Sequence, residues 1–257
     1  MATRILAILG VVFLVVLVLC GGLLFWAMSA GTAYQDKFFA AVNSGKAADV
    51  LALMHPALRA EIDEPVLQAW INEVNEKLGK CQGLSKTDFH TEAKQENNVA
   101  LVESSGTVNF EKGTAKSEIS FHGDQIVKFN VTSDLIAPGW FKSLPNTDLY
   151  RKQGEEFLRF ALEGQPDKAF AMMHPALQTK MPLDALRPGL EKLLAETGKL
   201  QSLALEKEDF QSGAEGQSLK LFYKLGMEKG PAFGVVEYKF AGLKGHLMAF
   251  NVKPGEK

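Results

Sequence analysis

The sequence predicts an α+β fold in which an N-terminal transmembrane helix is followed by two tandem copies of one domain, each with helices first and a curved antiparallel sheet afterwards. Three features predict this fold: a long apolar N-terminal stretch, an internal repeat, and a change from helical to strand periodicity within each copy. We expect the anchor over residues 1–30, the copies over residues 33–133 and 149–253, and a linker over residues 134–148.

The repeat is clearest in one pentapeptide. Met54-His55-Pro56-Ala57-Leu58 returns unchanged as Met173-His174-Pro175-Ala176-Leu177, at an offset of 119 residues. The same offset relates Phe38, Gly45, Leu67, Gly79, Lys80, Gln82 and Leu84 to Phe157, Gly164, Leu186, Gly198, Lys199, Gln201 and Leu203. Phe129-Asn130-Val131 matches Phe250-Asn251-Val252 at an offset of 121, so the second copy contains a two-residue insertion. A period this long is typical of a folding domain rather than of a solenoid unit.

The apolar stretch Ile5–Met28 contains no charged residue. Helical residues rise ~1.5 Å each, so the stretch could cross a hydrocarbon core of ~30 Å. The alternative is a cleaved signal peptide with its site at Ala27-Met28-Ser29, but such peptides have shorter apolar cores. The sequence favours an uncleaved single-pass anchor. The slight positive bias around Arg4 favours a cytoplasmic N-terminus and extracytoplasmic domains.

Charge and cysteine content exclude some classes of protein. The formal net charge is −2 and neither copy carries a basic stripe, so we expect no nucleic-acid partner. Cys20 lies in the apolar stretch and Cys81 is the second of two cysteines, which leaves no disulfide within a domain.

The first copy is expected to contain three helices. Tyr34 to Val42 form one apolar face, and Gly45 follows that helix as a C-terminal cap. A second helix is expected from Ala47 to Met54, where Pro56 restricts His55 and ends it. The third is expected from Pro65 to Leu78. After Gly79 the period changes to two, and strands are expected around residues 99–110, 119–121 and 126–131.

The second copy repeats this plan. Gly164 closes its first helix and Pro166 opens its second, and strands are expected over residues 219–225, 233–240 and 247–252. The copies differ in the third helix, where Pro188-Gly189 replaces the Ile-Trp region, so we expect a kink or a late start there. In the linker, Trp140 and Phe141 are expected to pack on one domain or in the cleft between the two rather than to be exposed.

This pattern of an aromatic helix, Met-His-Pro-x-Leu after the second helix, and then several strands resembles the nuclear-transport-factor-like or SnoaL-like cone superfamily. It is most similar to uncharacterised bacterial members that are membrane-anchored. The resemblance implies two cone-like domains, each with a curved sheet around its helices and an apolar cone that is open in some members and filled in others. Catalytic members place a carboxylate with a histidine or tyrosine inside the cone. The residues that would correspond are Glu103, Glu118, Tyr223, Glu237 and Tyr238.

We interpret His55 and His174 as architectural. A histidine in the last turn of the second helix can donate to free carbonyl groups while the proline fixes the chain's exit. Neither copy repeats a His, Cys or Asp at ligand spacing, and His90, His122 and His246 have no counterparts in the other copy. There is also no phosphate loop, nucleophile elbow or His-Glu-x-x-His motif. We therefore expect no metal, cofactor or catalytic residue, and leave the ligand-binding residues open.

These observations favour a membrane-tethered, non-catalytic binding or interaction module at the cell envelope. Its partners would be the membrane, through Ile5–Met28, and a small apolar ligand or a protein. One alternative is an isomerase- or dehydratase-like enzyme that uses one cone pocket. Another is a structural protein in which the domains pair as a pseudo-dimer. An open cone would favour binding or catalysis over a purely structural role.

Overall fold

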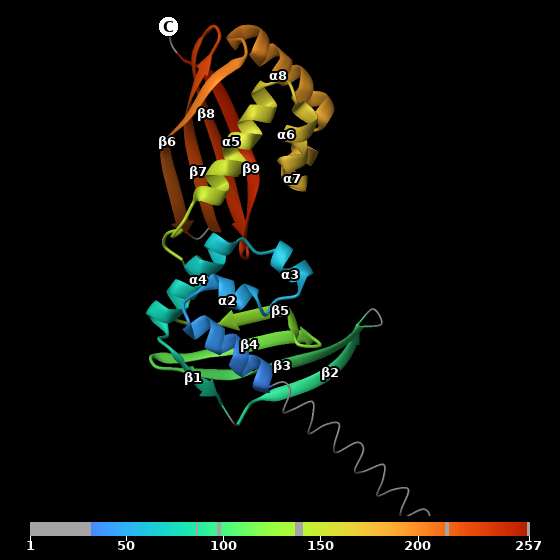
Figure 1. The fold of residues 1–257 in the computed structure, drawn as a ribbon, viewed down its shortest axis with the longest axis vertical. Coiled ribbons are helices and arrows are strands. Elements are labelled where there is room, and N and C mark those ends of the chain that lie inside the picture. Colours follow the sequence, from blue (N-terminus) through green and yellow to red (C-terminus); the bar gives the residue numbers. More distant parts are fainter. Residues whose placement is uncertain (1–31, 86, 97–98, 137–140, 214–215, 256–257) are drawn as a thin grey trace, which may run out of the picture. The chain divides into compact units, whose positions relative to one another are not determined.

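The computed structural model describes residues 32–255, apart from residues 86, 97–98, 137–140 and 214–215. The described residues divide into two compact units, one with residues 32–60 and 73–136 and the other with residues 61–72 and 141–255. Each unit is α+β, with helices that precede an antiparallel sheet, as the sequence predicts (Figure 1).

The first unit begins with a helix over residues 32–43. Helices α2 (Ala47–Leu51) and α3 (Pro56–Ala60) follow. The next helix in the chain, α4 (Glu64–Lys77), is divided between the units: its residues up to Asn72 belong to the second unit, and those from Glu73 belong to the first. Five strands come next: β1 (Cys81–Leu84), β2 (His90–Glu96), β3 (Val99–Phe110), β4 (Gly113–His122) and β5 (Gln125–Thr132). Their order is β1-β3-β4-β5, with β2 also paired to β3, and every pairing is antiparallel.

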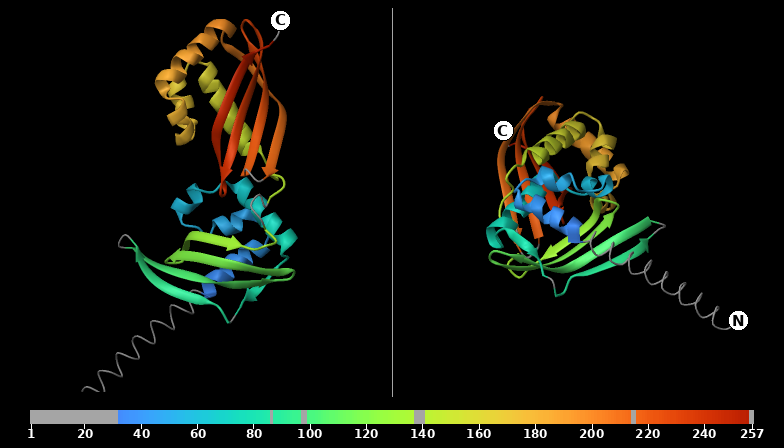
Figure 2. Two further views of the ribbon diagram at one scale, coloured as in Figure 1. Left: turned by 180° about the vertical axis from the view of Figure 1, so that it is seen from behind. Right: turned by 60° about the horizontal axis from the view of Figure 1, so that its bottom comes forward.

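The second unit has the same order of elements. Its helices are α5 (Asp148–Leu162), α6 (Pro166–Met172), α7 (Pro175–Lys180) and α8 (Leu183–Thr197). Its strands are β6 (Leu200–Gly213), β7 (Gly216–Met227), β8 (Gly230–Ala241) and β9 (Lys244–Pro254), which form an antiparallel meander. In both units the sheet is twisted and the helices lie on one of its faces (Figure 2).

The same contacts recur at matching places in the two units, which fits a duplicated domain. Phe38 packs on Phe129 with ring centroids 5.3 Å apart, and Phe157 packs on Phe250 at 4.9 Å. Because helix and strand residues face each other across the core in both pairs, these aromatics join the first long helix of each unit to its last strand.

A carboxylate at the turn after β3 and β7 makes a second recurring contact. Oε2 of Glu111 accepts a hydrogen bond from the Lys80 amide at 3.1 Å, and Oε2 of Glu228 accepts one from the Lys199 amide at 3.1 Å. The backbone groups of each pair bond in the opposite direction, from Glu111 N to Lys80 O and from Glu228 N to Lys199 O. Each carboxylate thus closes the sheet's turn onto the end of the long helix before it.

Bulges also recur. In the first unit Ser120 pairs with Lys128 but Phe121 pairs with Ile126, and in the second Glu237 pairs with Ala249 but Tyr238 pairs with Leu247. The extra residue is therefore Val127 on β5 and Met248 on β9. An extra residue at such a point bends the strand and increases its twist. Each sheet therefore bends at the same place in its last strand.

The transmembrane part of the expected fold class is corrected by the structure. Among the residues that it describes, no helix is both long and apolar enough to cross a membrane. The stretch Ile5–Met28, which the sequence suggests as the span, lies outside the described residues.

Several element boundaries also differ from expectation. The second helix of the first unit ends at Leu51 rather than at Met54, and Pro56 begins the short helix α3 instead of only ending the helix before it. Proline suits the first turn of a helix because no intrahelical acceptor is available to its nitrogen there. Helix α8 begins at Leu183, which matches Glu64 of α4 at the repeat offset, so the expected late start is wrong.

The linker region contributes to the second core. Phe141 is 1% exposed, its ring lies 5.7 Å from that of Phe210, and its carbonyl oxygen accepts a hydrogen bond from the Gln217 side chain at 2.8 Å. Its packing on a domain is as expected, whereas Trp140 lies outside the described residues. Residues 61–72 also belong to the second unit, where the Asp63 carboxylate accepts hydrogen bonds from the Tyr150 hydroxyl at 2.9 Å and the Gly245 amide at 2.7 Å.

Candidate functional site

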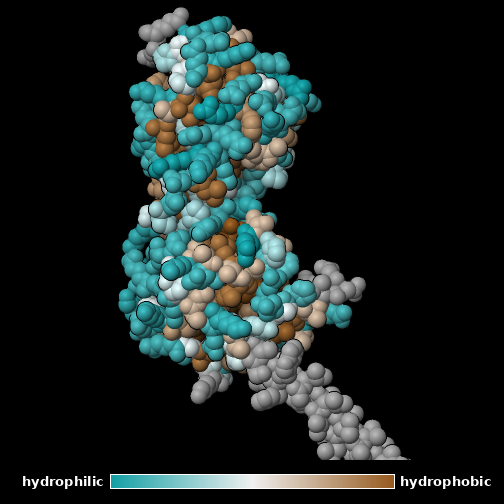
Figure 3. All heavy atoms as spheres, viewed as in Figure 1, coloured by the Kyte–Doolittle hydropathy of each residue, from teal (hydrophilic) through white to brown (hydrophobic). Residues whose placement is uncertain are grey.

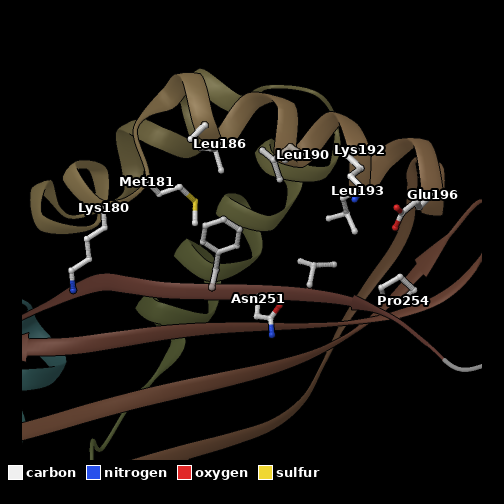
Figure 4. Close-up of a pocket in the computed structure, with 13 residues that line it drawn as sticks. Lys180, Met181, Leu186, Leu190, Lys192, Leu193, Glu196, Asn251 and Pro254 are labelled. Atoms are coloured by element: carbon white, nitrogen blue, oxygen red, sulfur yellow. The ribbon is translucent and has the colours of Figure 1, made fainter.

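The second unit contains an apolar groove between helix α8 and strand β9, with a volume of about 610 Å³ (Figure 4). Its walls come from the end of α7, the inner face of α8 and the last residues of β9. The apolar lining residues are Met181, Ala185, Leu186, Leu190, Leu193, Phe250, Val252 and Pro254. A volume in this range suits a small ligand rather than a protein segment.

Helical and strand periodicities together build the groove. Leu186, Leu190 and Leu193 follow one another at spacings of four and three residues, so they share one face of α8, and all three point towards β9 (Figure 4). Phe250 and Val252 alternate along β9 and therefore face the same side of the sheet. Leu186 and Leu190 are 3% and 5% exposed, so the groove continues the core outward.

Gly189 lines the groove from α8 but has no side chain to extend into it. A Cβ placed on Gly189 would meet no atom within 4 Å, so the space beside it is open. At the repeat offset of 119, Gly189 corresponds to Trp70 of α4, whose indole is 1% exposed. The two copies therefore carry the largest and the smallest side chain at the same helix position.

Polar groups are confined to the rim of the groove. Lys180 lies at one end, Lys192 and Glu196 lie towards the other, and Asn251 is on the strand side between them (Figure 4). The space-filling view shows apolar residues in patches on both units within a mainly hydrophilic surface (Figure 3). The groove thus combines an apolar floor with charged ends.

A second cavity, of about 600 Å³, contains the repeated histidine of the second copy. Its lining includes Gln153, Glu156, Met172, His174, Tyr238 and His246. The rings of His174 and His246 are in edge contact, with centroids 4.7 Å apart. His174 and Tyr238, which are far apart in the sequence, thus line one cavity together with His246.

The first unit contains a similar histidine pair. The rings of His55 and His122 lie 6.2 Å apart. His122 is the last residue of β4 and pairs with Gln125 across the hairpin, whereas His246 is on β9 and pairs with Lys239. The two pairs thus use opposite strands of the corresponding hairpins, and the second hairpin is longer. Matching by sequence position alone misses this similarity.

His55 and His174 are helix N-caps. In each, Nδ1 accepts a hydrogen bond from a backbone amide two residues on, Ala57 or Ala176, at 3.2 Å in both cases. Their own amides donate to the last strand, from His55 to Ile126 at 2.8 Å and from His174 to Leu247 at 3.1 Å. The sequence predicts that each histidine donates to free carbonyl groups at the end of the second helix, and this detail is wrong. Each imidazole instead accepts a hydrogen bond from a backbone amide at the start of the next helix.

Removing this cap should weaken the second unit by an amount typical of a helix N-cap. His174→Ala is expected to lower the free energy of unfolding by about 1 kcal/mol, whereas His174→Asn should retain most of it because asparagine is a good N-cap. Urea denaturation of the full chain measures both. Equal losses for alanine and asparagine would contradict the capping role, and the pair His55→Ala and His55→Asn provides the same comparison in the first unit.

Tyr238 and His246 lie in surroundings that disfavour their charged forms. Burial raises the pKa of Tyr238 above its ordinary range, with Tyr223 and Asp63 adding to the effect. Its hydroxyl is buried and has no hydrogen-bond partner among the described residues. The pKa of His246 is lowered, first by burial and then by His174 and Lys244, although Asp63 and Glu61 act in the opposite direction.

The lowered pKa of His246 gives stability a pH dependence. The unfolded chain binds a proton to this imidazole more readily than the folded chain does, so stability falls as the pH drops through about 6.5 and levels off below the folded pKa. We expect His246→Gln to reduce this loss. The urea concentration at the midpoint of unfolding, measured between pH 8 and pH 5 for the variant and the parent chain, tests this prediction. Identical pH profiles for the two proteins would contradict it.

The remaining candidate residues do not converge on a site. Glu103 pairs with Lys94 at 3.0 Å and Glu118 with Lys128 at 3.0 Å on the first sheet. The Tyr223 hydroxyl donates to the carbonyl oxygen of Arg151 at 3.2 Å, beneath Gly154. Glu237 lies in a polar hollow with Lys220 and Lys239. Within the described part of the chain, no group of three or more His, Cys, Asp or Glu residues could hold a metal ion.

The structure is that of a two-unit α+β protein with an apolar groove, and comparison with known proteins adds no family to this description. No family model and no curated protein matches the chain. It is similar to a solved structure titled "Structure of Bdellovibrio bacteriovorus Bd1075", with 12% identity over 52% of this chain and 50% of that chain and a TM-score of 0.31. The chain thus spans half the length of the Bdellovibrio protein, and a similarity this weak carries no argument.

Proposed function

We propose that this protein is a non-catalytic binding module at the cell envelope, and that the groove between α8 and β9 takes up a small apolar ligand. The observation that carries the proposal is the open groove beside Gly189, where the first copy has Trp70. Association with a membrane through the uncharged stretch Ile5–Met28 is part of the proposal, and it rests on composition alone.

The character of the groove supports binding. Its apolar side chains come from two rigid elements, α8 and β9, and Phe250 is fixed from behind by its contact with Phe157. Transfer of apolar surface from water into such a groove gains roughly 25 cal/mol per Å². Titratable side chains lie only at the rim, so the floor has no acid or base to act on a bound molecule.

A second candidate is the enzyme of the isomerase or dehydratase type. It is favoured by the cavity that contains Glu156, His174, Tyr238 and His246, where a carboxylate, two imidazoles and a phenol line one space. Such groups can exchange protons with a substrate when they lie within hydrogen-bond reach of it. No hydrogen bond among these four side chains occurs in the described structure, so the binding module remains the better supported function.

Photo-crosslinking decides between the two sites. The full chain is irradiated with a neutral alkyl diazirine, and the modified peptides are identified by mass spectrometry. We expect labelling of α8 and of β9 residues 250–254, with competition by unlabelled alkane alcohol. Competed labelling confined to peptides with Tyr238 and His246 would favour the enzyme candidate, and labelling of Ile5–Met28 alone would refute the groove as a binding site.

A further inference from the structure

We propose that the ligand of this groove is a single-chain amphipathic anion of the fatty-acid class, with its carboxylate at Lys180 and its alkyl chain along α8. The inference rests on the proposed function and specifies the chemistry of the ligand. It follows from the distribution of charge along the groove.

The two ends of the groove differ in charge. Lys192 and Glu196 are one helical turn apart on α8, so their charges offset each other at that end. Lys180, in the last turn of α7, lies at the opposite end, and the only acidic residue among those that line the groove is Glu196 (Figure 4). Among the described residues, no ion pair involves Lys180. An anion is therefore favoured at the Lys180 end.

The floor between these ends suits one alkyl chain. Met181, Leu186, Leu190 and Leu193 follow one another from the Lys180 end towards Glu196 (Figure 4). The lining of α8 from Leu186 to Glu196 is about 15 Å long at ~1.5 Å per residue. A long narrow apolar floor with a cation at one end matches a chain with one anionic head. A neutral oil would gain nothing from Lys180, and a cationic amphiphile would be repelled there.

A displacement titration with the full chain tests the inference. A neutral apolar fluorescent probe is displaced by dodecanoate, by dodecanol or by dodecylammonium, each below its micelle concentration. We expect dodecanoate to bind up to about fivefold more tightly than dodecanol at low salt, because an exposed ion pair contributes ~0.2–1 kcal/mol. Dodecylammonium should be the weakest. Decanoate, with two fewer methylenes, should bind about fifteenfold more weakly than dodecanoate.

Two matched variants locate the carboxylate. Lys180→Gln should abolish the preference for dodecanoate over dodecanol, whereas Lys152→Gln, at an exposed lysine of α5 that does not line the groove, should keep the preference. If the parent chain binds dodecanol and dodecanoate equally, the ligand class is wrong and the proposed binding function stands. If neither the single-chain compounds nor vesicles of anionic phospholipid displace the probe, the proposed function itself fails. Displacement only by vesicles of anionic phospholipid would overturn the inference in favour of a bilayer surface.

Discussion

Gly198→Ala is expected to lower the free energy of unfolding of the second unit by roughly 2–6 kcal/mol. Gly198 follows α8 at a φ of +74° and a ψ of −169°, a conformation found almost only in glycine, where an L residue costs about 1–3 kcal/mol. A Cβ at this position would also lie 2.6 Å from the Cβ of Glu228. That contact cannot be relieved by rotation of a side-chain tip, because it involves the first atom of the side chain, and such overpacking adds about 1–3 kcal/mol.

Gly164→Ala provides the control. Gly164 has a φ of +79°, yet a Cβ there would meet no atom within 4 Å. The alanine variant should therefore lose only the free energy that the positive φ costs an L residue. The first unit has the same pair: Gly79, where a Cβ would lie 2.6 Å from a carboxylate oxygen of Glu111, and Gly45, where it would meet nothing, both at +76°. Urea denaturation followed by circular dichroism measures all four variants. Equal losses within each pair would show that the contact to the glutamate is unimportant.

Gly189→Trp is expected to weaken binding of an apolar ligand by about 100-fold or more. The indole would take up space at the α8 wall, and displacing three or four buried methylenes costs about this much at ~0.8 kcal/mol each. Folding should be preserved, because glycine is a poor helix former and the position is exposed. The substitution places in the second copy the residue that the first copy has, Trp70.

Glu191→Trp is the matched control for this experiment. Glu191 is exposed on the same helix and does not line the groove. It should add an indole to α8 without changing the affinity for the neutral probe. A displacement titration compares both variants with the parent chain. Unchanged binding in Gly189→Trp would mean that the probe lies elsewhere, and equal weakening in both variants would indicate a general effect on the helix.

The order of elements could be predicted from the sequence because the responsible signals are local. The apolar spacing of Phe38 and Val42, the glycines at 45 and 79, and the alternation along β5 each report on a few neighbouring residues. The short helices α3 and α7 could not be found in this way, since five or six residues show no period. Pro56 supports either reading, as the end of one helix or the first residue of the next.

The groove and the histidine pairs depend on tertiary contacts, and therefore they could not be predicted from the sequence. The sequence shows that Pro188-Gly189 is a divergence, but that a glycine leaves space beside it depends on what β9 and α7 place opposite. His122 and His246 have different repeat positions because they lie on opposite strands of the corresponding hairpins, so only the tertiary ring contacts reveal that both approach the repeated histidine. One sequence feature points to this position: at the offset of 119, Trp70 in the first copy corresponds to Gly189 in the second.

The most direct test of the central claim is an experimental structure of the full chain with a bound long-chain alkyl ligand such as dodecanoate. We expect one alkyl chain between α8 and β9 of the second unit, in contact with Leu186, Leu190 and Val252, and with its polar end at Lys180. A ligand in the cavity of His174 and Tyr238, with the α8 groove empty, would contradict the account.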